Sequence, residues 1–313
     1  MKKISIMVPT YNEEENVELL HKAIQEEFKN NLPNYKYEIL FIDNKSKDNT
    51  REKIRKICKK DKNVKAIFNA QNFGQFNSPY YGLINTTGDC TISICADFQD
   101  PIEMIHKFVK EWENGYKIVI GIKTKSKESK IMYFFRSIYY KLIKKFSDVE
   151  QIEHFTGFGL YDKDFIKVLR ELKDSQPYMR GIVAELGYER KEIEYEQQKR
   201  LYGKTSNNFM KLYDAAMLGI TSYTKVGMHI ATLLGFTMAI ICILVALIYF
   251  ILKLIFWNSI PIGIVPIIIG MFFIGGVQLF FVGFLGEYIV NINARVMNRP
   301  LVVEEERVNF EGE

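Results

Sequence analysis

A long apolar region near the C-terminus constrains this chain more than any other feature. Between residues 228 and 285 the only charged residue is Lys253, whereas the first 225 residues are densely charged. Residues 226–252 and 262–285 are each long enough to cross a bilayer at about 1.5 Å of rise per residue. A buried hairpin inside a soluble protein is the alternative, but two such stretches in succession favour a pair of transmembrane helices.

The charges that flank this region predict its orientation. Lys204, Lys211 and Lys225 precede it, and Arg295 and Arg299 follow it, while the connection between the two stretches holds one lysine. Because basic residues gather on the cytoplasmic side of a membrane, both termini are expected in the cytoplasm. The chain is therefore predicted to be a multi-pass protein of the cell (inner) membrane.

This pattern divides the chain into four parts. Residues 1–205 are predicted to form a cytoplasmic domain, and residues 206–225 an amphipathic juxtamembrane helix. Residues 226–285 would then hold the two transmembrane helices, and residues 286–313 a cytoplasmic tail. A basic, aromatic-rich stretch at residues 126–146 is either an ordinary helix with a solvated basic face or a helix that meets anionic lipid headgroups.

Composition excludes several classes of protein. The balance of 42 Lys and Arg against 37 Asp and Glu gives a net charge of +5, which does not indicate a nucleic-acid-binding protein. Four cysteines without CxxC spacing argue against a zinc site or a disulfide framework and fit a reduced compartment. The apolar run at residues 4–8 is too short for a signal peptide and is typical of a buried first strand.

The first 121 residues alternate strand-like and helix-like patterns. Expected strands cover residues 4–8, 37–42, 64–68, 91–95 and 117–121, and expected helices cover residues 13–28, 50–60, 75–86 and 101–112. This alternation predicts an α/β fold with a doubly wound, mainly parallel sheet. Ligands of such sheets bind at the carboxyl ends of the strands, so the loops after the strands are the candidate site.

Two of these loops carry residues suited to a nucleotide. Pro9, Tyr11 and Glu13 follow the first strand, where Tyr11 could stack on a base and Glu13 could bind the nucleoside. Asp43 follows the second strand, where an acidic side chain can bind a ribose or a base edge. The simpler alternatives are a capped helix start for the first loop and turn or cap residues for the second.

The loop after the fourth expected strand is a candidate metal site. Asp97 and Gln99 offer oxygen ligands, as Mg²⁺ or Mn²⁺ prefers, and a diphosphate could supply the remaining ligands. Such a metal would neutralise a departing nucleoside diphosphate. Asp100 followed by Pro101 is also typical of a plain helix start.

Taken together, these motifs resemble glycosyltransferase family 2. The resemblance rests on Pro9-Thr10-Tyr11-Asn12-Glu13, on Asn72-Phe73-Gly74 and on Asp97-Phe98-Gln99-Asp100-Pro101. It narrows to the polyprenyl-phosphate branch, with dolichyl-phosphate mannose synthase and the bactoprenol glucosyltransferases, through Met179-Arg180-Gly181 and Arg200-Leu201-Tyr202-Gly203-Lys204-Thr205. The match runs over almost the whole chain, because bacterial members add two transmembrane helices.

The resemblance implies a GT-A fold and inverting transfer of a hexose from a nucleotide sugar, UDP-linked or alternatively GDP-linked, to undecaprenyl phosphate at the cytoplasmic face. It implies that Asp97 and Gln99 hold Mg²⁺ or Mn²⁺, and that Asp97, Arg200, Lys204 and Lys123 form the catalytic group, with the three basic residues holding the acceptor phosphate. The implied nucleotide-sugar site consists of Pro9, Tyr11, Glu13, Asp43, Asp97 and Gln99. Implied partners are the bilayer, a lipid-sugar flippase and further copies of the chain in a homotetramer.

The chain also departs from this family. Cys95 stands where the family's metal motif has its first aspartate, and a thiol suits Mg²⁺ or Mn²⁺ poorly. Gly157 and Gly159 stand where relatives usually carry an Asp and an Arg. A phosphomonoester, with its second pKa near 6, is largely ionised at neutral pH and needs no general base, so the missing Asp favours a lipid-phosphate acceptor. Two alternatives remain: extension of a polysaccharide, and a degenerate membrane scaffold.

Overall fold

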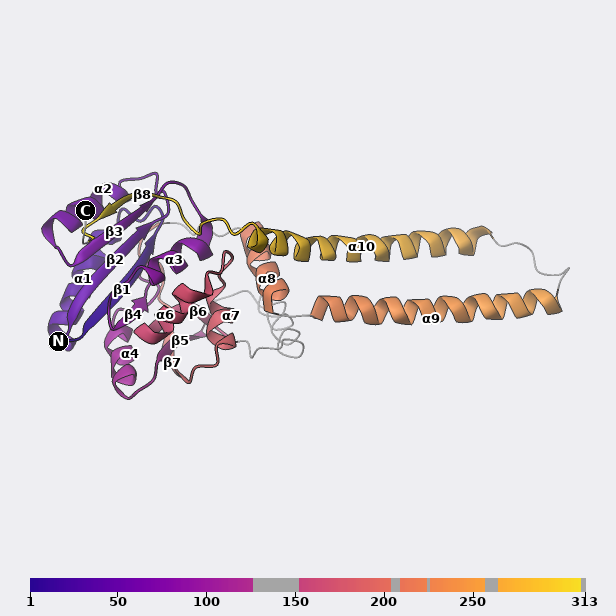
Figure 1. The fold of residues 1–313 in the computed structure, drawn as a ribbon, viewed down its shortest axis with the longest axis horizontal. Coiled ribbons are helices and arrows are strands. Elements are labelled where there is room, and N and C mark those ends of the chain that lie inside the picture. Colours follow the sequence, from indigo (N-terminus) through magenta and orange to yellow (C-terminus); the bar gives the residue numbers. More distant parts are fainter. Residues whose placement is uncertain (126–151, 204–208, 224–225, 257–263, 311–313) are drawn as a thin grey trace.

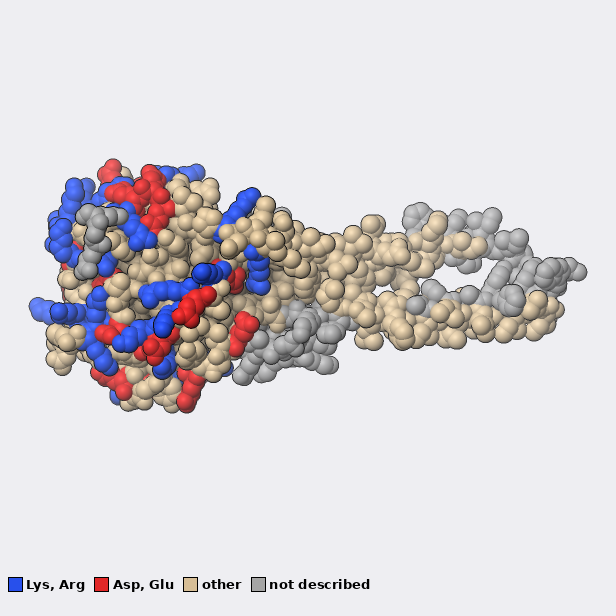
Figure 2. All heavy atoms as spheres, viewed as in Figure 1, with Lys and Arg blue, Asp and Glu red and all other residues tan. Residues whose placement is uncertain are grey.

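The computed structural model describes residues 1–125, 152–203, 209–223, 226–256 and 264–310. These residues form a domain built around one sheet and a pair of long antiparallel helices that project from it (Figure 1). The charged side chains crowd the sheet domain, whereas the described part of the projecting pair is almost free of them (Figure 2). The division into a charged domain and an apolar arm, which the sequence predicts, is thus visible in space.

Within the described residues, the sheet has eight strands in the order β7-β5-β6-β4-β1-β2-β3-β8. Their bounds are β1 Lys3–Thr10, β2 Lys36–Asp43, β3 Val64–Asn69, β4 Cys90–Ser93, β5 Ile118–Lys125, β6 Phe155–Asp162, β7 Arg190–Glu196 and β8 Glu304–Val308. Strand β1 pairs in parallel with β2 and with β4, and β2 pairs in parallel with β3. All five strands predicted from the first 121 residues are present, so the mainly parallel α/β sheet is confirmed.

Two strands run against the others and make the sheet mixed. Strand β6 lies antiparallel between β4 and β5, and β8 lies antiparallel at the edge beside β3. The sequence pattern predicts neither of them, nor β7. Gly157 and Gly159, which depart from the family motif, both lie in strand β6.

Helices cover both faces of the sheet. One face packs α1 (Val17–Asn31), α2 (Thr50–Lys60) and α4 (Met104–Glu113), with Ile6 and Phe41 among the buried strand residues. The other face packs α3 (Gly74–Ile84), α6 (Lys163–Leu172), α7 (Met179–Glu185) and the end of α8 (Phe209–Tyr223), with Met7 and Leu40 buried beneath them. Successive strand residues point to opposite faces, so β1 and β2 serve both layers and read as continuous apolar runs.

The projecting pair consists of α9 (Val226–Ile255) and α10 (Ile264–Val296). Its large apolar side chains are bare: Phe236 is 68% exposed, Leu279 is 74% exposed and Phe280 is 66% exposed. Among the described residues, one segment is long and apolar enough to cross a membrane, Phe273–Val296, with a mean hydropathy of 1.7. In α9 the apolar stretch Ile230–Val245 is shorter, so the expected pair of transmembrane helices is not confirmed.

The last part of the chain returns to the sheet domain. Helix α10 continues to Val296, beyond the predicted end of the second span, and β8 then pairs with β3. The residues expected to form a tail therefore supply an edge strand of the sheet. Since the N-terminus lies at the far end of the domain from α9 and α10 (Figure 1), the carboxyl ends of the parallel strands point toward the helical arm.

Candidate functional site

Four loops at the carboxyl ends of the parallel strands each contain a residue in the left-handed region of backbone space. These residues are Asn12 after β1, Lys45 after β2, Gly74 after β3 and Phe98 after β4, with φ angles of 57°, 65°, 88° and 60°. Asparagine and glycine enter this region easily, but a phenylalanine there is an outlier held by its surroundings. Such outliers cluster at functional sites.

Hydrogen bonds join the loop after β1 to the loop after β2. The Asn12 N–H donates to Ser46 Oγ at 2.9 Å, and the Glu13 N–H donates to Thr50 Oγ1 at 2.8 Å. In return, the Lys47 N–H donates to Asn12 Oδ1 at 2.8 Å. The predicted turn and cap residues of the second loop therefore hold the first loop in place. Pro9 is half-buried and pairs in register with Ile42, and Tyr11 lies half-buried beyond the strand.

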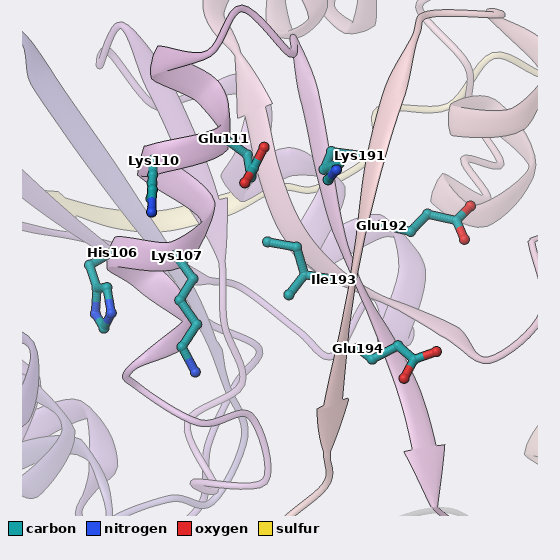
Figure 3. Close-up of a pocket in the computed structure, with 8 residues that line it drawn as sticks. All are labelled: His106, Lys107, Lys110, Glu111, Lys191, Glu192, Ile193 and Glu194. Atoms are coloured by element: carbon teal, nitrogen blue, oxygen red, sulfur yellow. The ribbon is translucent and has the colours of Figure 1, made fainter.

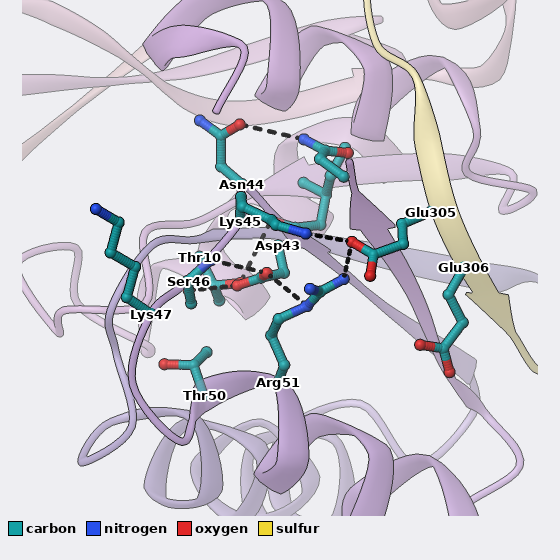
Figure 4. Close-up of polar contacts among 12 residues, drawn as sticks. Thr10, Asp43, Asn44, Lys45, Ser46, Lys47, Thr50, Arg51, Glu305 and Glu306 are labelled. Atoms are coloured by element: carbon teal, nitrogen blue, oxygen red, sulfur yellow. Dashed lines mark hydrogen bonds and ion pairs between the residues drawn. The ribbon is translucent and has the colours of Figure 1, made fainter. Parts of the chain in front are cut away.

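Asp43 anchors the second loop from below (Figure 4). Its side chain is fully buried; it accepts the Ser46 N–H at 3.1 Å, and Arg51 Nε lies 3.3 Å from Oδ1. Burial raises the pKa of Asp43, while Ser46, Arg51 and Thr10 act to lower it. Because its oxygens face protein groups, Asp43 orders the loop in this structure, and a direct contact with a nucleotide stays a prediction.

Asn44 joins the second loop to the third. Its amide donates to Asn72 Oδ1 at 3.0 Å and to the Gly74 carbonyl at 3.0 Å, and its oxygen accepts the Phe73 N–H at 2.8 Å. A carboxylate here would lack the two N–H donors of the amide. The sequence did not predict these hydrogen bonds, because Asn72–Gly74 was identified only by its resemblance to a family motif, which gives no contact between loops.

Arg200 brings together the first and fourth loops. Its Nη2 forms an ion pair with Glu13 Oε1, and its Nη1 lies 3.9 Å from Asp97 Oδ2. The chain around Arg200 is bonded to the fourth loop, since Gln198 N–H donates to the Gln99 carbonyl at 3.1 Å. Burial raises the pKa of Glu13, as does Asp97, while Asn16 and Arg200 oppose the rise. The structure thus places three predicted site residues, Glu13, Asp97 and Arg200, within one cluster.

Asp100 and Cys95 flank Asp97 in the loop after β4. Asp100 is buried, accepts the Cys95 N–H at 3.1 Å and the Tyr195 hydroxyl at 3.2 Å, and burial raises its pKa to about 6. The Cys95 thiol lies near the carboxylates of Asp100 and Asp97. Desolvation, together with these carboxylates, raises the pKa of the thiol well above its ordinary value. Its sulfur is a soft ligand and suits Mg²⁺ or Mn²⁺ poorly.

The described residues fit a metal only in part. No cluster of three or more His, Cys, Asp or Glu side chains that could hold an ion occurs among them. Asp97 is partly open, its side chain 13% exposed, and Gln99 is half-buried two residues further along the same loop. One carboxylate and one amide suit a hard cation that takes its other ligands from a diphosphate, whereas the soft sulfur of Cys95 does not.

The two other predicted basic residues are Lys123 and Lys204. Lys123 lies near the end of β5, where its N–H donates to the His154 carbonyl at 3.3 Å. Strand β5 runs parallel to β7 and antiparallel to β6, so Lys123 lies at the same carboxyl edge as the four loops. Lys204 lies outside the described residues.

The two glycines of β6 have structural reasons of their own. A Cβ on Gly159 would lie 2.6 Å from the Val119 carbonyl oxygen of the neighbouring strand, so any side chain there would push β5 and β6 apart. Gly157 has a φ of 101°, which other residues rarely adopt. The backbone of β6 thus disfavours a side chain at both positions where the family carries Asp and Arg.

A groove between α4 and β7 lies apart from these loops (Figure 3). None of the predicted site residues lines this groove. Its lining is polar or charged apart from Ile193 and consists of His106, Lys107, Lys110, Glu111, Lys191, Glu192, Ile193 and Glu194. A neighbouring pocket continues along α4 from Lys107 to Pro101 and along β7 to Gln198. It therefore ends beside the segment that carries Arg200.

Sequence comparisons with known proteins point to one family. Residues 5–186 match the model described as Glycosyl transferase family 2. The chain is similar to the bactoprenol glucosyl transferase of Shigella phage SfX, with 32% identity over 95% of this chain and 97% of the relative. It is also similar to the SfII prophage-derived bactoprenol glucosyl transferase of Shigella flexneri, with 32% identity over 95% and 96%. Among solved structures, mannosyl-3-phosphoglycerate synthase from Rubrobacter xylanophilus aligns with a TM-score of 0.46 and 16% identity, over 70% of this chain and 72% of that one.

Proposed function

The chain belongs to glycosyl transferase family 2 and is a glycosyltransferase, and from this premise we propose that it transfers a hexose to a polyprenyl phosphate. The proposed donor is a UDP-sugar and the proposed acceptor is undecaprenyl phosphate, at the cytoplasmic face of the cell membrane. The relatives named bactoprenol glucosyl transferase support this acceptor, since they match the chain over nearly its full length.

One observation carries the proposal: a polar cluster at the carboxyl edge of the sheet faces an arm with bare apolar side chains. Glu13, Asp97 and Arg200 form the cluster, and α9 and α10 form the arm. Water-exposed leucines and phenylalanines at this density are unfavourable, whereas the hydrocarbon core of a bilayer would cover them. A lipid phosphate at the bilayer surface would then lie on the side of the domain where the cluster is.

The arm holds its position through contacts at its base. Asn291 Nδ2 donates to Thr221 Oγ1 at 2.5 Å, and Arg295 donates to Ser222 Oγ at 3.1 Å, so α10 is bonded to α8. Helix α8 in turn packs on α7, where Gly181 leaves room for the Tyr223 ring. We propose that both α9 and α10 span the membrane, with residues 257–263 on its far side. A reporter inserted in that connection, active only outside the cytoplasm, tests this topology.

The residues of the site suit a direct displacement. A phosphate oxygen of the acceptor forms a bond to the anomeric carbon while the bond from that carbon to the donor's diphosphate oxygen breaks, and configuration inverts. The acceptor phosphate is already ionised at neutral pH, so no base in β6 is required. When bound at Asp97 and Gln99, Mg²⁺ or Mn²⁺ supplies charge neutralisation for the departing diphosphate. Arg200 orients Glu13 and Asp97 and offers a planar donor array suited to phosphate oxygens.

A donor panel tests the proposal. Membranes containing the full chain are incubated with undecaprenyl phosphate, Mg²⁺ or Mn²⁺, and labelled UDP-glucose, UDP-galactose, UDP-N-acetylglucosamine or GDP-mannose. We expect one donor to give a labelled lipid, with inverted anomeric configuration. Transfer onto a glycan but never onto the lipid phosphate would favour polysaccharide extension, and no turnover of any donor would favour a non-catalytic scaffold, the alternative that Cys95 supports.

A further inference from the structure

The C-terminal strand β8 connects the arm formed by α9 and α10 to the candidate nucleotide loops. It follows α10 after a few residues and pairs along the edge strand β3. Its Glu305 lies within bonding distance of two cations of the second loop and α2, with Oε2 2.6 Å from Lys45 Nζ and 3.1 Å from Arg51 Nη2 (Figure 4). A residue near the C-terminus therefore touches a loop near the N-terminus.

Arg51 extends this connection into the buried part of the loop. Its side chain is only 13% exposed and lies between Glu305 on β8 and Asp43 at the end of β2. Asp43 accepts from Ser46, whose Oγ in turn accepts the N–H of the left-handed residue Asn12. The contacts thus run without a break from β8 to the first loop, which carries Tyr11 and Glu13.

The neighbouring arginine provides a comparison within the same helix. Arg55 lies one turn along α2 from Arg51, forms an ion pair with Glu306 at 2.6 Å, and stacks on Phe68 with its guanidinium 4.5 Å from the ring centroid. Arg51 stacks on the same ring at 5.0 Å and likewise pairs with a glutamate of β8. Only Arg51 also forms an ion pair with Asp43.

We propose that Arg51 and Glu305 are positioning residues for nucleotide binding, through which β8 fixes the loops after β1 and β2. This inference rests on the proposed function, because it takes those loops as the nucleotide site. Loss of Arg51 leaves the buried Asp43 carboxylate without its cation and frees the loop that holds Asn12. The donor would then bind less tightly, while backbone hydrogen bonds from Gln198 to Gln99 and from Leu201 to Asp97 still hold the segment that carries Arg200 to the fourth loop.

The test compares matched variants of the full chain, purified in detergent. UDP binding is measured by calorimetry with Mg²⁺, together with KM for the donor, kcat and the midpoint of thermal unfolding. Arg51→Met is expected to weaken UDP binding about tenfold, equal to about 1.4 kcal/mol, and to raise KM equally while kcat changes little. Glu305→Gln, a half-exposed partner, is expected to weaken binding about threefold.

Arg55→Met and Glu306→Gln are the controls, since they remove the same kinds of contact without touching Asp43. They are expected to lower the unfolding midpoint as much as their counterparts but to leave UDP binding and KM within about twofold. Equal effects of the Arg51 and Arg55 variants on UDP binding would overturn the inference. If Arg51→Met does not fold, Glu305→Gln against Glu306→Gln decides alone. A wild-type chain that binds neither UDP nor GDP refutes the proposed function instead, and the inference falls with it.

Discussion

The pKa values of buried carboxylates shift in opposite directions at the two ends of the sheet. At the amino end, Glu38 is 2% exposed and accepts hydrogen bonds from Ser5 Oγ at 2.8 Å and Thr87 Oγ1 at 2.7 Å. Burial acts to raise the pKa of Glu38, but Thr87, Lys65, Ser5 and Lys3 outweigh it and hold the pKa below its usual value. At the carboxyl end, burial raises the pKa values of Glu13, Asp43 and Asp100 despite their partners.

This difference separates the amino end of the sheet from the end that carries the candidate site. Carboxylates whose partners outweigh burial stabilise the fold, whereas carboxylates held at a cost to folding are typical of sites where charge serves another purpose. A divalent cation held there, as the partner of a nucleoside diphosphate, would place positive charge beside these carboxylates. The comparison therefore supports the placement of the candidate site independently of any family motif.

The largest expected effect comes from comparing the two aspartates that flank β4: Asp89 directly precedes the strand, and Asp97 lies in the loop that follows it. Asp97→Ala is expected to lower sugar transfer about a thousandfold, since it removes a group that supports charge on the departing diphosphate. Asp89→Ala removes a carboxylate that accepts the Lys3 N–H at 3.0 Å and the Lys163 ammonium at 3.1 Å. We expect it to cost about 1 kcal/mol of stability and to leave transfer unchanged. Transfer that survives Asp97→Ala in the donor assay contradicts the assignment.

The pH dependence of stability is the second test. The pKa of Glu38 is lowered on folding, so its contribution is present above about pH 4.5 and is lost as the pH falls through the folded pKa. The pKa of Asp43 is raised on folding, so its contribution is present below about pH 3.8 and is lost as the pH rises through the folded pKa.

Glu38→Gln should therefore cost about 3 kcal/mol at pH 7, because Lys65 and Lys3 lose their buried partner, and should flatten the loss of stability in acid. In the wild-type chain, ionisation of Asp43 lowers stability as the pH rises above about 4, and Asp43→Asn should abolish this decline. At pH 7, Asp43→Asn should therefore lower stability less than Glu38→Gln does. Thermal unfolding of both variants in detergent between pH 3 and pH 8 measures this. Parallel pH profiles for the two variants would show that the ends of the sheet do not differ.

Cys95→Asp is the smallest test and adds one more carboxylate to the end that carries the candidate site. We expect the metal concentration for half-maximal transfer to fall about fivefold, because an oxygen ligand replaces a thiol at the metal loop. Without metal, the added charge beside Asp97 and Asp100 should lower the unfolding midpoint, and Mg²⁺ should restore it. Cys95→Ser is the control, since it removes sulfur without adding charge. A Ser variant that behaves like the Asp variant would mean that only the sulfur matters.

Local pattern in the sequence was enough to predict the first five strands and the helices between them. Apolar runs such as Ile4–Val8 sit in the centre of the sheet, where burial on both faces imposes that pattern. Strand β8 was missed because its sequence, Glu-Glu-Glu-Arg-Val, is charged and half-exposed. An edge strand of this kind is specified by its pairing with β3 and not by its own residues. Strand β6 was missed because its two glycines resemble a loop.

The candidate site shows the same limit. Residues close in sequence to a strand end, such as Asp97 and Glu13, were predicted, and the structure brings them together with Arg200. Arg51 was missed because its importance depends on Glu305, 254 residues away. No periodicity or spacing links residues so far apart, and only the fold makes them neighbours.

The return of the chain to the sheet has a practical consequence for dissecting the protein. A fragment that ends before α8 would lose β8 together with the apolar arm formed by α9 and α10. It would expose the whole edge of β3, and exposed edge strands promote edge-to-edge aggregation. It would also leave Arg51 and Arg55 without their glutamate partners on β8. A useful excision would instead keep α8, whose Tyr223 ring packs against Gly181 of α7, remove α9 and most of α10, and join β8 back through a short linker. The arm is thus an insertion into a domain, and not an appendage at its end.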